Sequence, residues 1–450
     1  MTPEKLLAEA PEAALQADEK LKRVIGPWGL GAAAVNIAVG AGIFVVPAFV
    51  AAILGPAAIV AYFVCGIAVV LVLTCYVEIG SFVRRSGGGV AYIEEAFGPL
   101  MGFLAWVMYS VGYEVIACAA LAVALLASLA VWVPALDHGA PRILMLLAVF
   151  GSLAAVNIIG VRQGLRVAVA STVAKLVPLL LAIVAGIFYV HWHQLRWAGW
   201  PPAAKLGEAS LILFFAFQGI EEALAPSGEI RDPARTVPRA MFGATGTVVL
   251  LYVALQLISQ GVLGGELAHQ TTAPLAAVAG RVVGVAGSTL VMIGVAVSIF
   301  GSLAGGMLSA PRAFFLAAED GTLPRALARV HPRFRTPHVA ILTVAILMFL
   351  LAASGGFKRL AILSSASILC VYLAICLGAL KLRYTRKSVP GAFRAPGGPV
   401  VGILGSIVVI WLLAHSTKVE VTALSGTLAV SIAYYFVRRW YLNRRGQTIR

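Results

Sequence analysis

Charged residues are scarce in this chain. They make up 12% of its 450 residues, whereas hydrophobic residues make up 60% and the mean hydropathy is +0.95. A water-soluble chain of this length needs far more charge to cover its surface. Because the apolar runs are continuous rather than alternating, they favour helices over strands. The composition therefore predicts an all-α integral membrane protein.

Motifs for catalysis and cofactor binding are also missing. There is no glycine-rich phosphate loop of the Walker type, and the apolar runs hold neither paired catalytic acids nor a nucleophile beside a base. The cysteines lie within apolar runs and lack metal-ligand spacing: Cys65, Cys75, Cys118, Cys370 and Cys376. We expect neither an enzyme nor a metal or organic cofactor, and a proton gradient as the energy source.

Twelve apolar runs are long enough to cross a bilayer core, which takes about 20 helical residues. Residues 1–23 lack the apolar centre of a signal peptide and are predicted to form a cytoplasmic tail. Residues 442–450 are predicted to form a second tail. The predicted spans are 24–53, 57–83, 97–130, 142–160, 165–190, 208–229, 238–263, 280–316, 337–354, 359–382, 400–416 and 420–441.

The distribution of Lys and Arg predicts the orientation, because basic loops stay in the cytoplasm. If the N-terminus is placed inside the cell, 26 of the 34 such residues fall in the inner segments and 7 in the outer loops. The remaining one, Lys175, lies within the fifth span. This asymmetry supports an even number of spans in a cell inner or plasma membrane, with both termini cytoplasmic. The net charge of +15 then requires no nucleic acid, because basic clusters at helix ends suit anionic lipid.

Two spans are interrupted by glycine at mid-depth. In the first, residues 40–42 separate an inner half-helix ending near Val39 from an outer half beginning at Ile43. The free amides of Ala41, Gly42 and Ile43 would suit a carboxylate, and the carbonyl of Ala38 an ammonium group.

The sixth span has a comparable break at Gly219, with the carbonyls of Phe215 and Gln218 left without helical partners. Breaks in the first helix of each of two five-helix units are typical of an inverted-repeat transporter with a midplane site. We predict a 5+5 inverted repeat of residues 24–190 and 208–382, followed by two extra helices at 400–441. The alternative is that the glycines only permit close helix packing.

Three acidic residues within the predicted spans are candidates for a role in transport. Glu221 and Glu222 follow the second break, and because neighbours on a helix face different ways, we take Glu221 as the member facing the pathway. The alternative is that both glutamates lie at the end of the span that is exposed to water. For Glu114 three roles stay open: contact with a substrate side chain, proton carriage, or closure of a helix seam.

Lys175 lies in the middle of the fifth span, where an ammonium group has no water. Loss of solvation favours its neutral form, so it could gain and lose a proton during transport. When charged it could bond carbonyls near the first break and the hydroxyls of Ser298 or Ser302. The alternative is a fixed structural cation that permits exchange without net proton flow.

Four motifs in order resemble the amino acid, polyamine and organocation permeases, which have the leucine-transporter fold. The first is residues 40–47 (GAGIFVVP), with Ala41 where a serine is common, and the second runs from 78–81 (EIGS) through 86–89 (SGGG) and Tyr92 to 97–99 (FGP). The third covers 214–221 (FFAFQGIE), 228–233 (GEIRDP) and 235–239 (RTVPR). The fourth covers 320–324 (DGTLP), 331–332 (HP) and 336–337 (TP).

The resemblance implies roles for individual residues. Backbone of Ala41, Gly42 and Ile43 would bind the substrate carboxylate, and carbonyls of Ala38, Phe215 and Gln218 its amino group. Phe215 would also close over substrate from outside, Tyr92 with Glu221 would form the inner gate, and Lys175 would match a lysine of the proton-linked and sodium-independent branches. The missing hydroxyl at Ala41 puts the strength of carboxylate binding in doubt.

These observations predict a secondary active amino acid permease that works by alternating access, either proton-coupled or exchanging. Its partners are a small amino acid or amine and the lipid bilayer. A cationic amino acid or polyamine antiporter is the main alternative, which Glu114 keeps open. A channel and an intramembrane enzyme are remote alternatives. The substrate, the direction of transport, the ion stoichiometry and the oligomeric state are not predictable from these residues.

Overall fold

The computed structural model describes residues 25–82, 87–160, 165–197, 199–224, 230–385 and 393–444. The predicted tail 1–23 lies outside these ranges, as do residues 445–450 and the motif residues Ser86 and 228–229. Within the described part the chain is helical apart from its connections and one parallel bridge between Ile25 and Ile230. The all-α class predicted from composition is confirmed.

The first half of the chain contains α2 (Pro27–Ala38), η1 (Ala41–Phe44), α3 (Val46–Leu54), η2 (Gly55–Ala57), α4 (Ala58–Phe82), α5 (Gly88–Phe97), α6 (Pro99–Trp106), η3 (Val107–Val115), α7 (Ile116–Ala130), η4 (Pro134–Leu136), α8 (Gly139–Ile159), α9 (Leu165–Gly186), η5 (Ile187–Tyr189) and η6 (Trp192–Leu195). The segment η3 is π-helical, a wider winding that is frequent at functional sites.

The second half contains α10 (Ala203–Phe217), η7 (Ile220–Leu224), α11 (Pro233–Leu263), η9 (Gly264–His269), α12 (Pro274–Val283), α13 (Val285–Glu319), η10 (Arg325–Ala328), α14 (His338–Ser354), α15 (Phe357–Thr385), α16 (Pro399–Leu413) and α17 (Lys418–Arg444). Proline occupies the first turn of α2, α6, α11 and α16, where its missing amide costs no hydrogen bond.

Within the described ranges, eight helical stretches are long and apolar enough to span a membrane. One of them, Val46–Ser81, joins the outer half of the predicted first span to the predicted second span. Four shorter apolar helices are Lys175–Tyr189, Pro274–Val283, His338–Ser354 and Pro399–Leu413. The chain is therefore a multi-pass membrane protein, while the count of twelve spans and the inverted repeat stay predictions.

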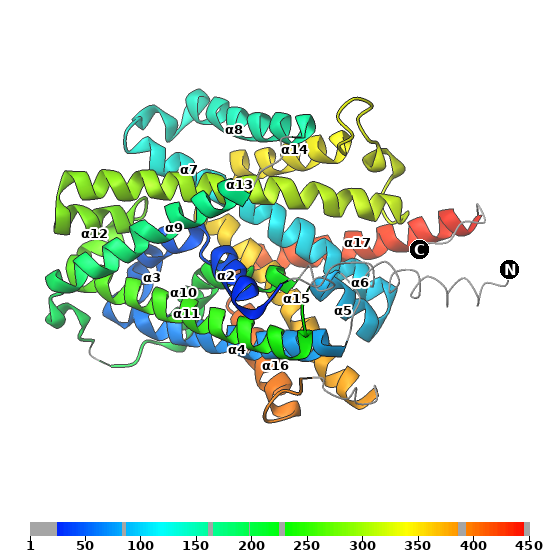
Figure 1. Ribbon diagram of the computed structural model, residues 1–450, viewed down its shortest axis with the longest axis horizontal. Helices are drawn as coiled ribbons and strands as arrows, with labels where there is room; N and C mark the ends of the chain where they lie inside the picture. The colour runs from blue at the N-terminus through cyan, green and yellow to red at the C-terminus, as the bar shows by residue number, and fades with distance from the viewer. Residues whose placement is uncertain are drawn as a thin grey trace.

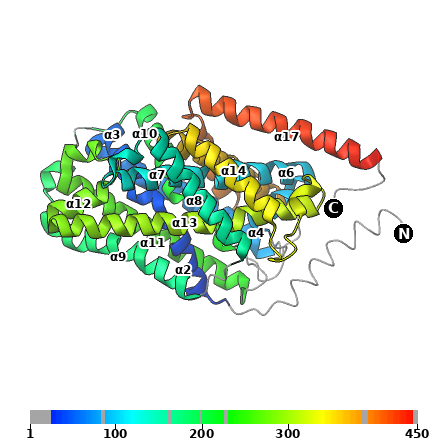
Figure 2. The same ribbon diagram turned by 90° about the horizontal axis from the view of Figure 1, so that it is seen from above.

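The helices lie roughly along the long axis of the molecule (Figure 1). The loop between α13 and α14 and the end of α17 lie at the same end, on the right of Figure 1, and we call this the basic end. Its arginines include Arg325, Arg329, Arg333, Arg335, Arg438 and Arg444. The end with α12 is called the opposite end. Seen from above, α17 runs along the outside of the bundle (Figure 2).

Both predicted helix breaks are present. The first helix stops at Ala38, and after an extended Gly40 the chain makes the short turn η1 before α3 begins at Val46. The second break follows Phe217, with Gln218 extended and Gly219 at φ +95° before η7. The first outer half differs slightly from the prediction, because a 3-10 turn from Ala41 replaces regular helix at Ile43.

Candidate substrate site

A cavity of about 530 Å³ lies against both helix breaks. Its wall combines residues of α2, η1, η3, α7, α9, α10, η7 and α13, which are far apart in the sequence. The predicted site residues on this wall are Ala38, Gly42, Glu114, Lys175, Phe215, Gln218 and Ser302. The predicted residues Ile43, Tyr92, Gly219, Glu221 and Ser298 are not among those that line it.

The two breaks approach closely because Gly42 has no side chain. A Cβ atom at Gly42 would lie 3.0 Å from Cδ1 of Phe215 and 3.1 Å from Cα of Ala216. At Gly219 the positive φ favours glycine, and a Cβ there would lie 2.8 Å from the hydroxyl of Tyr113. The two glycines therefore allow the chain to leave the helical conformation, and they also allow the broken helices to touch.

Tyr252 of α11 joins the two breaks. Its fully buried hydroxyl lies 2.7 Å from the carbonyl oxygen of Ala38 and 3.0 Å from that of Ala216. The Ala38 carbonyl also accepts the amide of Gly40 at 2.7 Å. An ammonium group reaching Ala38 must therefore compete with Tyr252. Sequence reasoning missed this residue, because a single tyrosine in an apolar helix gives no signal of its partners.

Replacing Tyr252 with phenylalanine is expected to reduce substrate uptake at least about tenfold, because loss of a buried hydrogen-bond donor to unwound carbonyls costs about 1–3 kcal/mol. The measurement is initial uptake rate in proteoliposomes. Tyr62→Phe is the matched control, since Tyr62 is equally buried but donates to the side chain of Gln256 at 3.0 Å. Equal losses in both variants would contradict a special role for Tyr252.

Three phenylalanines pack in a row that begins at Phe215 on the cavity wall, and we call this row the aromatic seal. Phe215 packs edge-on against Phe357 with 5.5 Å between ring centroids, and Phe357 lies 5.6 Å from Phe49. On the side of the basic end the wall continues along α13 with Gly305 and Ser309, both exposed. The cavity wall is thus exposed along α13.

Lys175 is 7% exposed and lines the cavity. Its Nζ lies 3.4 Å from the carbonyl oxygen of Asn36, in the last turn of α2. Ser302 shares the cavity wall with it, whereas Ser298 is fully buried and its hydroxyl has no hydrogen-bond partner among the described residues. The ammonium therefore meets a carbonyl next to the first break.

The acidic residue on the cavity wall next to the second break is Glu222 rather than Glu221. Glu222 accepts a hydrogen bond of 2.8 Å from the hydroxyl of Tyr113. Glu221, the member that the sequence interpretation placed in the pathway, is 6% exposed, and neither of its carboxyl oxygens has a hydrogen-bond partner among the described residues. The interpretation differs from the structure because the turn at Gly219, with φ +95°, sets the direction of η7, and two neighbouring acids give no sequence signal of which one faces the cavity.

The other two predicted polar residues lie in different surroundings. Glu114 faces the cavity from η3 and accepts a hydrogen bond from Ser309 of α13. Tyr92 is 1% exposed and packs against Tyr76 with 6.2 Å between ring centroids, and Tyr76 in turn lies 5.9 Å from Tyr372. Tyr92 thus belongs to a cluster of tyrosines, and neither it nor Glu221 lines the cavity.

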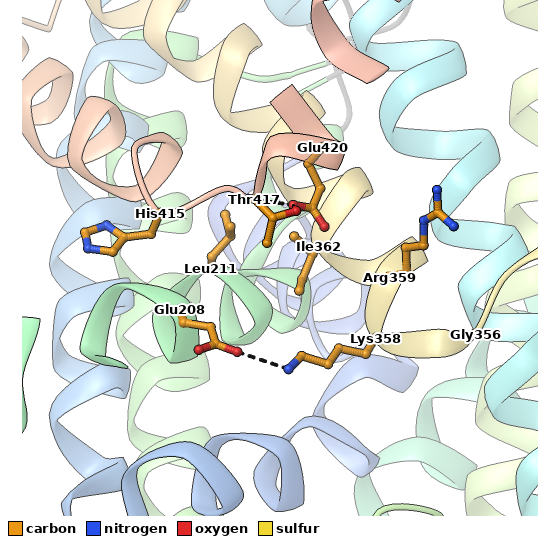
Figure 3. A pocket seen from close by; sticks show the side chains of 9 residues that line it. All are labelled: Glu208, Leu211, Gly356, Lys358, Arg359, Ile362, His415, Thr417 and Glu420. Atoms are coloured by element: carbon orange, nitrogen blue, oxygen red, sulfur yellow. Dashed lines mark hydrogen bonds and ion pairs between the residues drawn. The ribbon is translucent and has the colours of Figure 1, made fainter. Parts of the chain in front are cut away.

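A second cavity, of about 370 Å³, lies between the first turns of α10 and α15 and the α16–α17 connection (Figure 3). There Lys358 and Glu208 form an ion pair of 3.0 Å, while Arg359 and His415 point away from it (Figure 3). Exposed pairs of this kind contribute little to stability. Lys358 follows Phe357 directly, so the pair ties the start of α15 to α10 beside the aromatic seal.

Long apolar helices around a polar cavity between two helix breaks define a multi-pass membrane transporter. The sequence profile of the amino acid permease family matches residues 25–437, and the chain belongs to this family. The family predicted from the sequence motifs is thereby confirmed. Membership of this family supports amino acid transport as the general function.

Relatives that match over nearly the whole chain include three transporters of Bacillus subtilis. The chain is 30% identical to the serine/threonine exchanger SteT of Bacillus subtilis over 446 residues, covering 94% of this chain and 98% of the relative. It is 28% identical to the methylthioribose transporter of Bacillus subtilis, covering 96% and 97%. It is 25% identical to the branched-chain amino acid permease BcaP of the same organism, covering 94% and 95%.

Proposed function

We propose that the protein is a secondary active carrier for amino acids or closely related amines, working by alternating access in the plasma membrane. The observation that carries the proposal is the meeting of both helix breaks at one cavity. The basic end is the cytoplasmic end in this proposal, because Lys and Arg concentrate there. The arrangement then represents a carrier closed to the outside by Phe215, Phe357 and Phe49.

The substrate zwitterion is bound by backbone at the breaks. Its carboxylate takes the amides of Ala41, Gly42 and Ile43, and its ammonium group takes nearby carbonyls. The support is that Gly42 and Phe215 share the cavity wall and that α2 and α10 lose their regular hydrogen bonds there. The carbonyl ligands proposed are those of Ala38, Phe215 and Gln218, with Gly219 shaping the turn.

Gating and coupling are assigned to side chains around this site. Phe215 is the outer gate, and Tyr92 with Glu221 forms the inner gate behind the wall. Lys175 carries the coupling proton and, when charged, bonds the end of α2, with Ser302 and Ser298 as further partners on α13. Its contact with the Asn36 carbonyl supports this assignment, because loss of the proton weakens that bond and loosens the first break.

A flux experiment tests the proposal. Purified protein in proteoliposomes is given labelled serine, leucine, alanine, arginine and putrescine, with and without an inward proton gradient. The expected result is saturable uptake of at least one of them, acceleration by unlabelled substrate inside the vesicle, and dependence on the gradient. A flux that neither saturates nor shows counter-exchange is the signature of a pore, and this outcome would overturn the carrier mechanism.

A further inference from the structure

Two carboxyl groups face the same cavity from different elements. Glu114 comes from η3 and Glu222 from η7. Ser309 donates to Oε1 of Glu114, whereas Glu222 accepts at Oε1 from Tyr113 and has Tyr109 as a second hydrogen-bond partner. Because each carboxylate oxygen has two lone pairs, both groups can accept further hydrogen bonds from a ligand.

Two amide side chains on the same wall also offer unused acceptors. Gln218 is 7% exposed and donates its Nε2 to the hydroxyl of Ser364 at 3.2 Å, while its Oε1 has no hydrogen-bond partner among the described residues. The buried Oδ1 of Asn36 is likewise without one in that part of the chain. Buried oxygens without a donor are costly, so the wall is incomplete until a donor-bearing ligand arrives.

The donors on the wall do not match these acceptors. Lys175 is the one Lys or Arg among the residues that line the cavity, and one of its hydrogens points to the Asn36 carbonyl. Its single positive charge can balance only one of the two carboxyl groups. A zwitterion at the breaks adds no net charge, so the second carboxyl group must either hold a proton or be paired with a cation of the ligand.

We propose that Glu114 and Glu222 form a side-chain subsite for a second cationic group, a guanidinium or an ammonium. The preferred substrates are therefore basic amino acids, with diamines as the related class. The inference rests on the proposed function and names its substrate class. A guanidinium brings five N–H donors, which can bond the oxygens that have no donor on the wall. It also brings a positive charge, which can pair with the second carboxyl group. A substrate with a neutral side chain leaves the second carboxylate without a balancing cation.

Arginine and citrulline test this subsite, because they share length and shape and differ in charge at the side-chain end. The measurement is inhibition of labelled arginine binding to the purified protein in detergent and of arginine uptake in proteoliposomes. The expected result is that arginine competes at least about tenfold better than citrulline, the range found for hydrogen bonds to a charged group. A ratio of one or below in the unmodified protein overturns the inference.

Glu114→Gln and Glu222→Gln keep the shape of each side chain and remove its charge. Each is expected to bring the arginine-to-citrulline ratio close to one while citrulline binding is retained. Glu208→Gln is the matched control, because Glu208 is paired with Lys358 in the second cavity (Figure 3) and should leave the ratio unchanged. A ratio that survives both cavity variants sinks the subsite.

Different results would overturn the carrier function and the side-chain subsite. Saturable uptake of serine or leucine without preference for arginine over citrulline leaves the carrier standing and removes the basic substrate class. The absence of saturable uptake for every compound in the panel removes the carrier, and the subsite falls with it.

Discussion

Gly42→Val is expected to lower substrate uptake by about 100-fold or more, without loss of the folded protein. Even the first carbon of the new side chain would lie 3.1 Å from the Cα of Ala216 and 3.0 Å from the ring of Phe215. A backbone atom cannot move aside as a flexible side chain can, so the two breaks must separate. Overpacking typically costs about 1–3 kcal/mol, here placed at the contact that forms the site.

The measurement is initial uptake rate, with substrate binding followed by thermal shift of the purified protein. Gly246→Val in α11 is the matched control, because nothing lies within 4 Å of a Cβ built at Gly246. That variant should transport like the unmodified protein. If Gly42→Val keeps full uptake, the breaks do not need to touch, and the backbone site assigned to them is wrong.

The breaks were predictable because glycine is a strong local signal. The cluster at residues 40–42 and the pair Gln218 and Gly219 each interrupt an apolar run, and no helical packing is needed to see them. Their meeting at one cavity was also expected, since discontinuous helices leave backbone groups that require a common partner. Local chemistry thus carried the prediction of both the fold class and the centre of the site.

Side-chain direction was not predictable to the same degree. Whether Glu221 or Glu222 faces the cavity depends on the direction in which η7 leaves the turn at Gly219, where φ is +95°. The contact of Tyr252 with Ala38 and Ala216 joins residues far apart in the chain. The seal at Phe357 likewise depends on tertiary packing that no local pattern encodes.

Lys175→Ala is expected to abolish accumulation driven by a proton gradient while retaining exchange of substrate across the vesicle. In the unmodified protein the buried ammonium bonds the Asn36 carbonyl, so its protonation state is tied to the end of α2 at the first break. Without the amine no group senses the gradient through that bond. One proton per substrate and a gradient of one pH unit supply about 1.4 kcal/mol, or about tenfold accumulation, and the variant should show none.

Lys175→Arg separates a titrating group from a fixed cation. A guanidinium stays protonated in proteins, so it preserves the positive charge on the cavity wall but cannot release a proton. If Lys175 carries the coupling proton, the arginine variant exchanges substrate yet fails to accumulate it. Lys205→Ala, an exposed lysine of α10, controls for general loss of charge. Undiminished accumulation in Lys175→Ala would rule out proton coupling through this residue, and accumulation in Lys175→Arg would make it a structural cation.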